Sequence, residues 1–260
     1  MSENRSKKIE VLRRRLRDAE SAVVAFSGGV DSAVLSVLAF QELGNRMVAA
    51  MGVSPSVPRR DRAFANTFCQ QQGIPFREIA TNEFEDQRYM SNPANRCYFC
   101  KSELYTKFVL LAEELRFRYV FDGTLASDLA GSRPGFQAVK ERARVVAPLV
   151  EATMTKEDIR AIARDLNLEV ADKPNTACLA SRLPTFTTVD PDLLRRIDSA
   201  EDGLRELGFR QVRVRHHGDV ARVEVGREEL LTAMCKRTDI ERNLVELGWR
   251  FVTLDMAGYG

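Results

Sequence analysis

The sequence has none of the long apolar segments that a membrane protein needs. No apolar run approaches the ~20 residues that cross a bilayer. Residues 1–20 are charged and hold no apolar stretch before a small-residue cleavage site, so they do not resemble a secretory signal. The five cysteines are an odd number, which disfavours a disulfide framework and favours thiols, metal ligands or catalysis. We therefore expect a cytoplasmic protein with no membrane contact.

The net charge of the chain is also small. The formal net charge of the 260 residues is +2, which gives no overall signature of nucleic-acid binding. We therefore expect no nucleic-acid partner, although arginine is plentiful and could be concentrated locally.

Short apolar runs alternate with helical periods over most of the chain. The predicted strands are residues 22–26, 47–53, 75–79 and 119–122. The predicted helices are residues 6–16, 32–43, 60–72, 103–116 and 155–166. Strands that alternate with helices of this length predict an α/β fold with a doubly wound parallel sheet and crossover helices.

The pattern of elements changes after residue 186. The expected order there is a helix, two closely spaced strands, two helices and a strand, at residues 191–207, 212–216, 220–225, 228–236, 240–247 and 251–254. This order predicts a second, smaller α+β domain. We place the first domain at residues 1–185 and the second at residues 186–260.

A glycine-rich loop follows the first predicted strand and reads Ser27-Gly28-Gly29-Val30-Asp31-Ser32. Glycines let backbone amides approach an anion, and the start of the following helix adds partial positive charge. Ser27 and Ser32 can donate hydrogen bonds to phosphate oxygens, whereas Asp31 repels phosphate unless it holds a shared Mg²⁺ ion. The loop is neither a Walker loop nor a dinucleotide fingerprint. The alternative is a tight strand-to-helix turn that binds nothing.

The loop resembles that of the PP-loop ATP pyrophosphatase superfamily, which contains GMP synthetase, NAD synthetase, asparagine synthetase and tRNA thiolases. The resemblance implies that ATP is cleaved to AMP and pyrophosphate. It also implies that adenine lies against the second strand, and that a later loop lines the same pocket and supports metal or nucleotide. The residues in question are Met51, Gly52 and Val53 in the strand, and Gly123 and Asp128 in the loop.

Three cysteines have a spacing that suits metal binding. Cys97 and Cys100 lie just ahead of a predicted helix and can reach one ion or cluster, and Cys178 from a distant loop can complete three ligands. In a [4Fe-4S] cluster three ligands leave one iron free to hold exogenous sulfide. The alternative for Cys97 and Cys100 is a redox pair or two packed thiols.

The remaining residues near these cysteines, or of the same type, have simpler interpretations. Lys101 could neutralise phosphate or be a solvated lysine. Cys69 and Cys235 each lie among apolar neighbours within a predicted helix, so we expect both to be buried small side chains.

Several segments together resemble the ATP-dependent sacrificial sulfur transferase family, LarE. They are the PP-loop, residues 96–101, 122–124 and 178–182, and residues 212–219. The likeness extends from near the amino terminus to the carboxyl terminus. It implies conversion of the carboxylates of pyridinium-3,5-biscarboxylic acid mononucleotide into thiocarboxylates, during assembly of the nickel-pincer nucleotide of lactate racemase. It also leads us to expect a homo-oligomer.

The LarE family has two chemical forms. In one, a single cysteine that matches Cys178 gives up its own sulfur and becomes dehydroalanine. In the other, three cysteines hold a [4Fe-4S] cluster that relays external sulfide. Cys97 and Cys100 together with Cys178 favour the cluster form.

Several residues are candidates for binding an anionic nucleotide substrate. Arg213 and Arg215 alternate on one strand face and can converge on one anion, and Glu224 on the next strand could orient them. Ser181 and Arg182 follow directly after Cys178 in the chain. The alternative is a solvated strand face with surface ion pairs.

The proposed chemistry needs no general base. ATP activates the carboxylate, and deprotonated sulfur is then nucleophilic enough to attack. The presence of only two histidines, His216 and His217, agrees with this. The rival hypotheses are a PP-loop tRNA thiolase, an amidotransferase-type adenylating enzyme that gives the cysteines no role, and a regulatory module that senses ATP without cleaving it.

Overall fold

The computed structural model describes residues 3–129, 134–174 and 176–259. The chain divides into two compact units. The first comprises Met1–Ser54, Arg59–Tyr89 and Ala94–Thr176, and the second comprises Pro55–Pro58, Met90–Pro93 and Ala177–Gly260. Among the described residues, no helix has the length and apolar character needed to cross a membrane.

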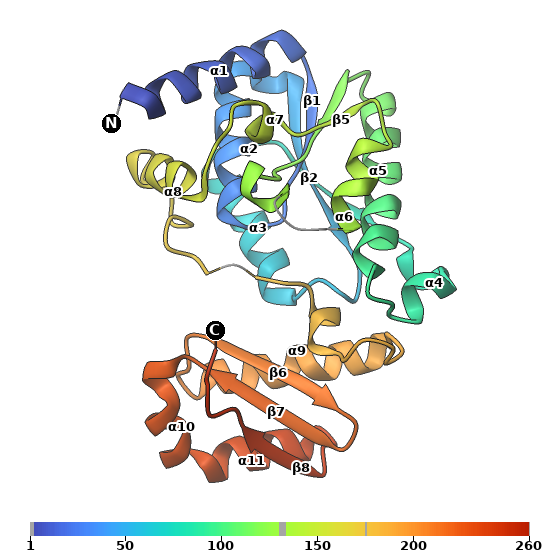
Figure 1. Ribbon diagram of the computed structural model, residues 1–260, viewed down its shortest axis with the longest axis vertical. Coiled ribbons are helices and arrows are strands. Elements are labelled where there is room, and N and C mark those ends of the chain that lie inside the picture. Colours follow the sequence, from blue (N-terminus) through green and yellow to red (C-terminus); the bar gives the residue numbers. More distant parts are fainter. Residues whose placement is uncertain (1–2, 130–133, 175, 260) are drawn as a thin grey trace. The chain divides into compact units, whose positions relative to one another are not determined.

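The first unit is built around a five-stranded parallel sheet (Figure 1). Its strand order is β3-β2-β1-β4-β5, and every neighbouring pair is parallel. The strands are β1 Ala22–Ala25, β2 Met47–Val53, β3 Phe76–Ala80, β4 Tyr119–Phe121 and β5 Val145–Val146. The apolar central strands are buried because helices cover both faces of the sheet. The predicted α/β fold with a doubly wound parallel sheet is confirmed.

Most helices of this part of the chain lie between consecutive parallel strands, whereas the first precedes β1 and the last two follow β5. They are α1 Glu3–Ala19, α2 Val30–Leu43, α3 Arg59–Gln71, α4 Gln87–Met90, α5 Arg96–Glu114, α6 Pro134–Lys140, α7 Pro148–Glu151 and α8 Lys156–Asp165. Short 3-10 turns lie at Gly44–Arg46, Glu83–Glu85 and Ala126–Leu129. The sequence did not predict α4, α6, α7 or β5, because each is too short to show a hydrophobic period.

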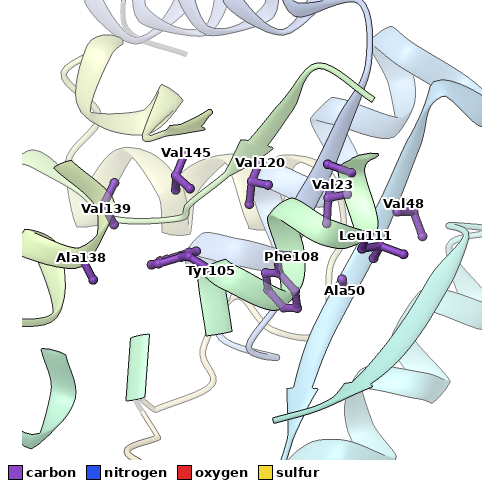
Figure 2. Close-up of a cluster of buried hydrophobic side chains, with 11 residues drawn as sticks. Val23, Val48, Ala50, Tyr105, Phe108, Leu111, Val120, Ala138, Val139 and Val145 are labelled. Atoms are coloured by element: carbon purple, nitrogen blue, oxygen red, sulfur yellow. The ribbon is translucent and has the colours of Figure 1, made fainter. Parts of the chain in front are cut away.

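One face of the sheet packs against α5 and α6. Figure 2 shows the apolar cluster at this contact, in which Val23, Val48 and Val120 of three neighbouring strands meet Phe108 and Leu111 of α5. Burial of such side chains supplies the main driving force for folding. The cluster fixes α5 against the strands whose carboxyl ends carry the candidate site.

Helix α5 begins earlier than the sequence predicted. It starts at Arg96, not at Glu103, so Cys97 and Cys100 lie within its first two turns and not ahead of it. The prediction was wrong because the residues before Glu103 show no apolar period. None of the described side chains caps this end, although Asn95 stands at the N-cap position.

The second unit contains a three-stranded sheet in the order β6-β7-β8. Its elements are α9 Pro191–Glu206, β6 Val212–His217, β7 Val220–Val225, α10 Leu230–Cys235, α11 Arg237–Glu246 and β8 Phe251–Leu254, with 3-10 turns at Leu179–Arg182 and Arg227–Glu229. Strands β6 and β7 are antiparallel, and β7 and β8 are parallel. Gly218 has a φ of +64° in the tight turn between β6 and β7, where a left-handed residue is needed.

The side chains of β6 alternate between two environments. Val212 and Val214 are buried, whereas Arg213 and Arg215 lie on the other face. Arg213 is directly opposite Glu224 in the register of β6 and β7. This arrangement places Arg213, Arg215 and Glu224 on one face of the second sheet.

The two remaining cysteines differ in burial. Cys69 is buried in α3, as predicted, and burial raises the pKa of its thiol to about 12. Cys235 is exposed, so the prediction of a buried side chain was wrong. It ends the short helix α10, where the neighbouring Leu231 and Met234 are also exposed.

Candidate active site

The PP-loop joins β1 to the start of α2. Gly28 has a φ of +72°, a left-handed conformation that favours glycine. Gly29 stands at the N-cap of α2, and none of the described side chains caps that helix end. The first amides of α2 are therefore available to an anion.

The two serine hydroxyls of the loop contact each other. Their oxygens lie 3.1 Å apart, and Ser32 Oγ donates to the backbone oxygen of Gly29 at 3.1 Å. The Ser32 hydroxyl also accepts from the Ser27 amide at 3.2 Å. The local network holds both hydroxyls at the loop that the sequence assigned to phosphate.

Asp31, the predicted Mg²⁺ ligand, pairs with a lysine that the sequence interpretation missed. Lys156 Nζ donates to Asp31 Oδ1 at 2.9 Å and to Oδ2 at 2.7 Å. Lys156 is the first residue of α8, which packs against α2. A carboxylate oxygen is a suitable ligand for Mg²⁺, so Asp31 fits the predicted ion once Lys156 releases it.

A second lysine, Lys173, also holds the loop. Its ammonium donates to Gly28 O at 3.0 Å and to Asp61 Oδ1 at 3.2 Å. The same ammonium lies 3.7 Å from the centre of the Phe64 ring, within the range of a cation–π interaction. Lys173 therefore stabilises the left-handed Gly28, and no pattern in the sequence pointed to it.

Two glycines assigned to the nucleotide pocket are sites of close packing. A Cβ on Gly123 would lie 3.4 Å from the Cα and amide nitrogen of Ser32, so the end of β4 lies directly against the PP-loop. A Cβ on Gly52 would overlap a Leu104 methyl group. The Leu104 side chain therefore packs directly on the backbone of Gly52, between Met51 and Val53 at the end of β2.

Asp128 lies in the turn after β4. Its carboxylate accepts a hydrogen bond from the Leu125 amide at 3.1 Å. The contact stabilises the short turn Ala126–Leu129. That Asp128 supports metal or nucleotide stays a prediction.

A buried carboxylate, Asp122, follows β4 in one of the segments that resemble the LarE family. It is 5% exposed and accepts hydrogen bonds from the Tyr105 hydroxyl and, at 2.9 Å, from the Thr124 amide. Burial acts to raise the pKa of Asp122, but the positive charge of Lys101 and these hydrogen bonds outweigh it, so the pKa is lowered. Burial and the Asp122 charge raise the pKa of Tyr105. Asp122 is therefore charged inside the sheet domain.

Lys101 is the main ionic partner of Asp122. Its ammonium lies 3.5 Å from Asp122 Oδ2 and 5.7 Å from the centre of the Tyr105 ring. A Cβ on Gly135 would lie 2.9 Å from Lys101 Cδ, so α6 packs closely on this side chain. The predicted phosphate-binding role of Lys101 would require the ammonium to leave a buried carboxylate.

The candidate cysteines belong to two units. Cys97 is exposed and Cys100 is half-buried, both within the first two turns of α5, whereas Cys178 belongs to the second unit. Among the described residues, no group of three or more His, Cys, Asp or Glu side chains is placed to hold a metal ion. Cys97 and Cys100 lie three residues apart on one helix, and a cluster held by all three cysteines stays a prediction.

Arg182 holds the backbone around Cys178. Its guanidinium donates to the carbonyl oxygens of Ala177 at 2.6 Å and Cys178 at 3.0 Å. It also donates to both carboxylate oxygens of Glu201, at 2.8 and 3.1 Å. Burial acts to lower the pKa of Arg182, but the hydrogen bond and charge of Glu201 outweigh it, so the pKa is raised. The sequence interpretation missed Glu201, which lies within α9.

Arg215 pairs with Glu224 across the two strands. Two guanidinium nitrogens donate to the two oxygens of Glu224, and Arg215 Nη1 donates to Ser181 O at 3.3 Å. Arg213 instead donates to the Tyr259 hydroxyl at 2.8 Å and lies 4.4 Å from the centre of that ring. The structure therefore places Ser181, Arg215 and Glu224 together and adds Tyr259, which no sequence pattern indicated.

The amino-terminal part of the chain matches the NAD synthase family over residues 6–98. An uncharacterised protein of Synechocystis, slr1717, is 39% identical over 254 residues, covering 97% of this chain and 94% of that protein. The pyridinium-3,5-bisthiocarboxylic acid mononucleotide synthase of Lactiplantibacillus plantarum is 32% identical over 246 residues, covering 94% of this chain and 88% of the synthase. The chain belongs to the LarE family.

Other relatives share only part of this LarE-family chain. One subunit of the glutamine-hydrolysing GMP synthase of Archaeoglobus fulgidus is 27% identical over 170 residues, which cover 62% of this chain and 55% of that protein. The NAD synthase match includes the PP-loop. The LarE-family chain is therefore an ATP-using enzyme of the PP-loop class.

Proposed function

We propose that this protein adenylates a carboxylate of pyridinium-3,5-biscarboxylic acid mononucleotide and converts it to a thiocarboxylate. The product would be used in the biosynthesis of the nickel-pincer nucleotide, the cofactor of lactate racemase. The observation that carries this proposal is the PP-loop, where an uncapped helix start, two serine hydroxyls and Asp31 meet in a chain that aligns with the Lactiplantibacillus plantarum synthase.

The proposed reaction has two steps. A carboxylate oxygen attacks the α-phosphorus of ATP, and pyrophosphate leaves. A sulfur nucleophile then attacks the activated acyl carbon, and AMP leaves with the electron pair of the broken C–O bond. Ser27, Ser32 and the first amides of α2 would bind and orient the phosphates during the first step.

Two groups would assist this chemistry. Asp31 would hold Mg²⁺, which neutralises phosphate charge when bound. Cys97, Cys100 and Cys178 would hold a [4Fe-4S] cluster, which supplies an iron site for external sulfide when bound. The thiol donors suit iron, and the exposure of Cys97 and partial exposure of Cys100 support access to that turn of α5. Without the cluster, Cys178 itself would be the sulfur donor.

The substrate would bind mainly through the second unit. Arg213 and Arg215 would bind its anionic groups, because guanidinium forms paired hydrogen bonds with carboxylate and phosphate. Glu224 would orient Arg215, and Arg182 would hold the Cys178 segment together with Ser181. We further propose that residues 1–185 form the adenylation domain and residues 186–260 the substrate-binding domain of a cytoplasmic homo-oligomer.

The test is a turnover experiment with the purified protein, ATP, Mg²⁺ and the biscarboxylate mononucleotide. The expected products are AMP, pyrophosphate and a thiocarboxylate, in reactions with and without added sulfide. Formation of ADP would contradict the proposal.

Intact mass and iron and sulfide analysis separate the two sulfur sources. A brown protein that keeps its mass and needs sulfide would support the cluster. A colourless protein that loses the mass of one H₂S per turnover would assign the sulfur to Cys178.

A further inference from the structure

The three arginines that are candidates for binding the substrate are held in different ways. Arg182 forms an ion pair with the carboxylate of Glu201. Arg215 forms an ion pair with the carboxylate of Glu224. In the part of the chain that the structure describes, no carboxylate forms an ion pair with Arg213. An anionic substrate that reaches this face of the sheet therefore meets a guanidinium whose charge these carboxylates do not neutralise.

Glu224 lies directly opposite Arg213 in the second sheet but binds two other guanidinium groups. The two residues are paired in the register of β6 and β7. Both carboxylate oxygens of Glu224 accept hydrogen bonds from Arg215, and Glu224 Oε1 also accepts from Arg222 Nη2 at 2.9 Å. The carboxylate is therefore already engaged, and Arg213 is held by a different kind of group.

The group that holds Arg213 is the aromatic side chain of Tyr259. Arg213 Nη2 donates to the Tyr259 hydroxyl at 2.8 Å, and Arg213 Cζ lies 4.4 Å from the centre of the ring. A hydroxyl and the face of an aromatic ring attract a guanidinium without adding a full negative charge beside it. The ring therefore fixes the direction of the Arg213 side chain and leaves its positive charge for a ligand.

A turn after β8 brings Tyr259 to this position. The Asp255 carboxylate accepts from the Ala257 amide at 2.9 Å, and the Gly258 amide donates to Asp255 O at 3.1 Å. Gly258 has a φ of +69°, and a Cβ at this residue would lie 3.0 Å from Val225 O. The Tyr259 amide then donates to Val225 O at 2.7 Å. The backbone of Tyr259 is thus fixed beside the end of β7.

The face of β6 that carries Arg213 also contacts the segment around the candidate sulfur donor. Arg215, two positions further along this face, donates from Nη1 to Ser181 O at 3.3 Å. Ser181 follows Cys178 by three residues, and its amide donates to Cys178 O at 3.0 Å. An anion bound to Arg213 would therefore lie on the strand face that supports the cysteine segment.

We propose that Tyr259 is a positioning residue for the substrate, which holds the guanidinium of Arg213 directed at an anionic group of the mononucleotide. This inference rests on the proposed function, because it concerns the same substrate site. Arg213 would contact the anion, and Tyr259 would act only through Arg213. Without the ring, the long Arg213 side chain must be ordered when the substrate binds, and this ordering weakens binding.

The experiment measures pyrophosphate release by the full chain, with ATP, Mg²⁺ and the biscarboxylate mononucleotide. Tyr259→Phe keeps the ring and should raise KM for the mononucleotide about threefold to tenfold, the scale of one lost hydrogen bond. Tyr259→Leu removes the ring as well and should raise it at least about tenfold. For both variants kcat and KM for ATP should change less than about twofold, because the lost interaction is binding of the mononucleotide alone. An unchanged KM for the mononucleotide in Tyr259→Leu would overturn the inference.

A double-mutant cycle with Arg213→Met separates positioning from support of the fold. In the Arg213→Met background, Tyr259→Leu should change KM for the mononucleotide less than about twofold, because there is no guanidinium left to position. A change as large as in the wild-type background would show that Tyr259 acts independently of Arg213, and would overturn the inference.

Phe251→Leu is the matched control. It removes a second contact between an aromatic ring and an arginine in the same sheet, since Arg250 Cζ lies 5.2 Å from the centre of the Phe251 ring. This variant should keep the wild-type KM for the mononucleotide, and an increase equal to that of Tyr259→Leu would overturn the inference. Wild-type protein that releases no pyrophosphate would instead contradict the proposed function, and this inference with it, whereas active wild type with unaltered Tyr259 variants contradicts the inference alone.

Discussion

Replacing Glu201 by alanine should destabilise the second unit strongly. The Arg182 and Glu201 side chains are 5% and 1% exposed, so their ion pair is almost completely removed from water. Glu201 also accepts from the buried Val214 amide at 3.2 Å and from Arg205 Nη2 at 3.1 Å. The variant would leave the Arg182 charge and the Val214 amide buried without this carboxylate.

The expected loss is about 3–5 kcal/mol, as found when one partner of a buried ion pair is removed. Trp249 is the only tryptophan, lies in the second unit and is 1% exposed, so its fluorescence during urea unfolding reports on that unit. Arg195→Ala is the control, because Arg195 makes an exposed ion pair on the same helix and should cost at most about 1 kcal/mol. A Glu201→Ala loss as small as the control would refute this account of how the Cys178 segment is held.

Three further predictions concern single side chains. Tyr105→Phe removes a hydrogen bond to the charged, buried Asp122 and should cost about 1.5–3 kcal/mol in urea unfolding followed by circular dichroism; no change would show that the bond is unimportant. Burial lowers the pKa of His216, whose Nδ1 accepts from Trp249 Nε1 at 3.1 Å. As pH falls, the unfolded chain therefore binds a proton at His216 before the folded chain does. The stability that depends on a neutral His216 is present above pH 6.5 and is lost as pH falls below it. His216→Gln should flatten this pH dependence of the unfolding free energy, as followed by Trp249 fluorescence. Gly28→Ala forces a left-handed φ of +72° on a side chain, which should cost about 1–2 kcal/mol and weaken ATP binding in calorimetry; unchanged stability would contradict the strain.

The sheet and the PP-loop could be predicted because their signals are local. Apolar runs, glycines and helical periods lie within short stretches, and they located β1, the loop and α2 closely. The start of α5 could not be predicted, because Cys97 and Cys100 lie in a turn without an apolar period. Strand β5 has only two residues, which is too few for any periodic signal.

The partners of the candidate residues were the least predictable part of the site. Lys156 and Asp31 are separated by 125 positions in the sequence, and Arg215 and Ser181 by 34. No local pattern links such pairs, since only the folded chain brings them together. The sequence could therefore indicate which residue types carry the chemistry. It could not indicate which of these charged side chains are already neutralised by an ion pair in the folded protein.

The burial of the charged pairs indicates which cations can change partner when an anionic substrate binds. Arg182 and Glu201 are almost fully buried, so separating them would leave an unpaired charge in the interior. Lys156 and Asp31 are about a quarter exposed, and water can compensate the carboxylate while the ammonium moves. Arg215, at 27% side-chain exposure, resembles Lys156 in this respect, although its partner Glu224 is only 8% exposed. We therefore expect Lys156 to exchange its partner on ligand binding, Arg215 to bind an anion while it keeps Glu224, and Arg182 to remain a fixed support for Cys178.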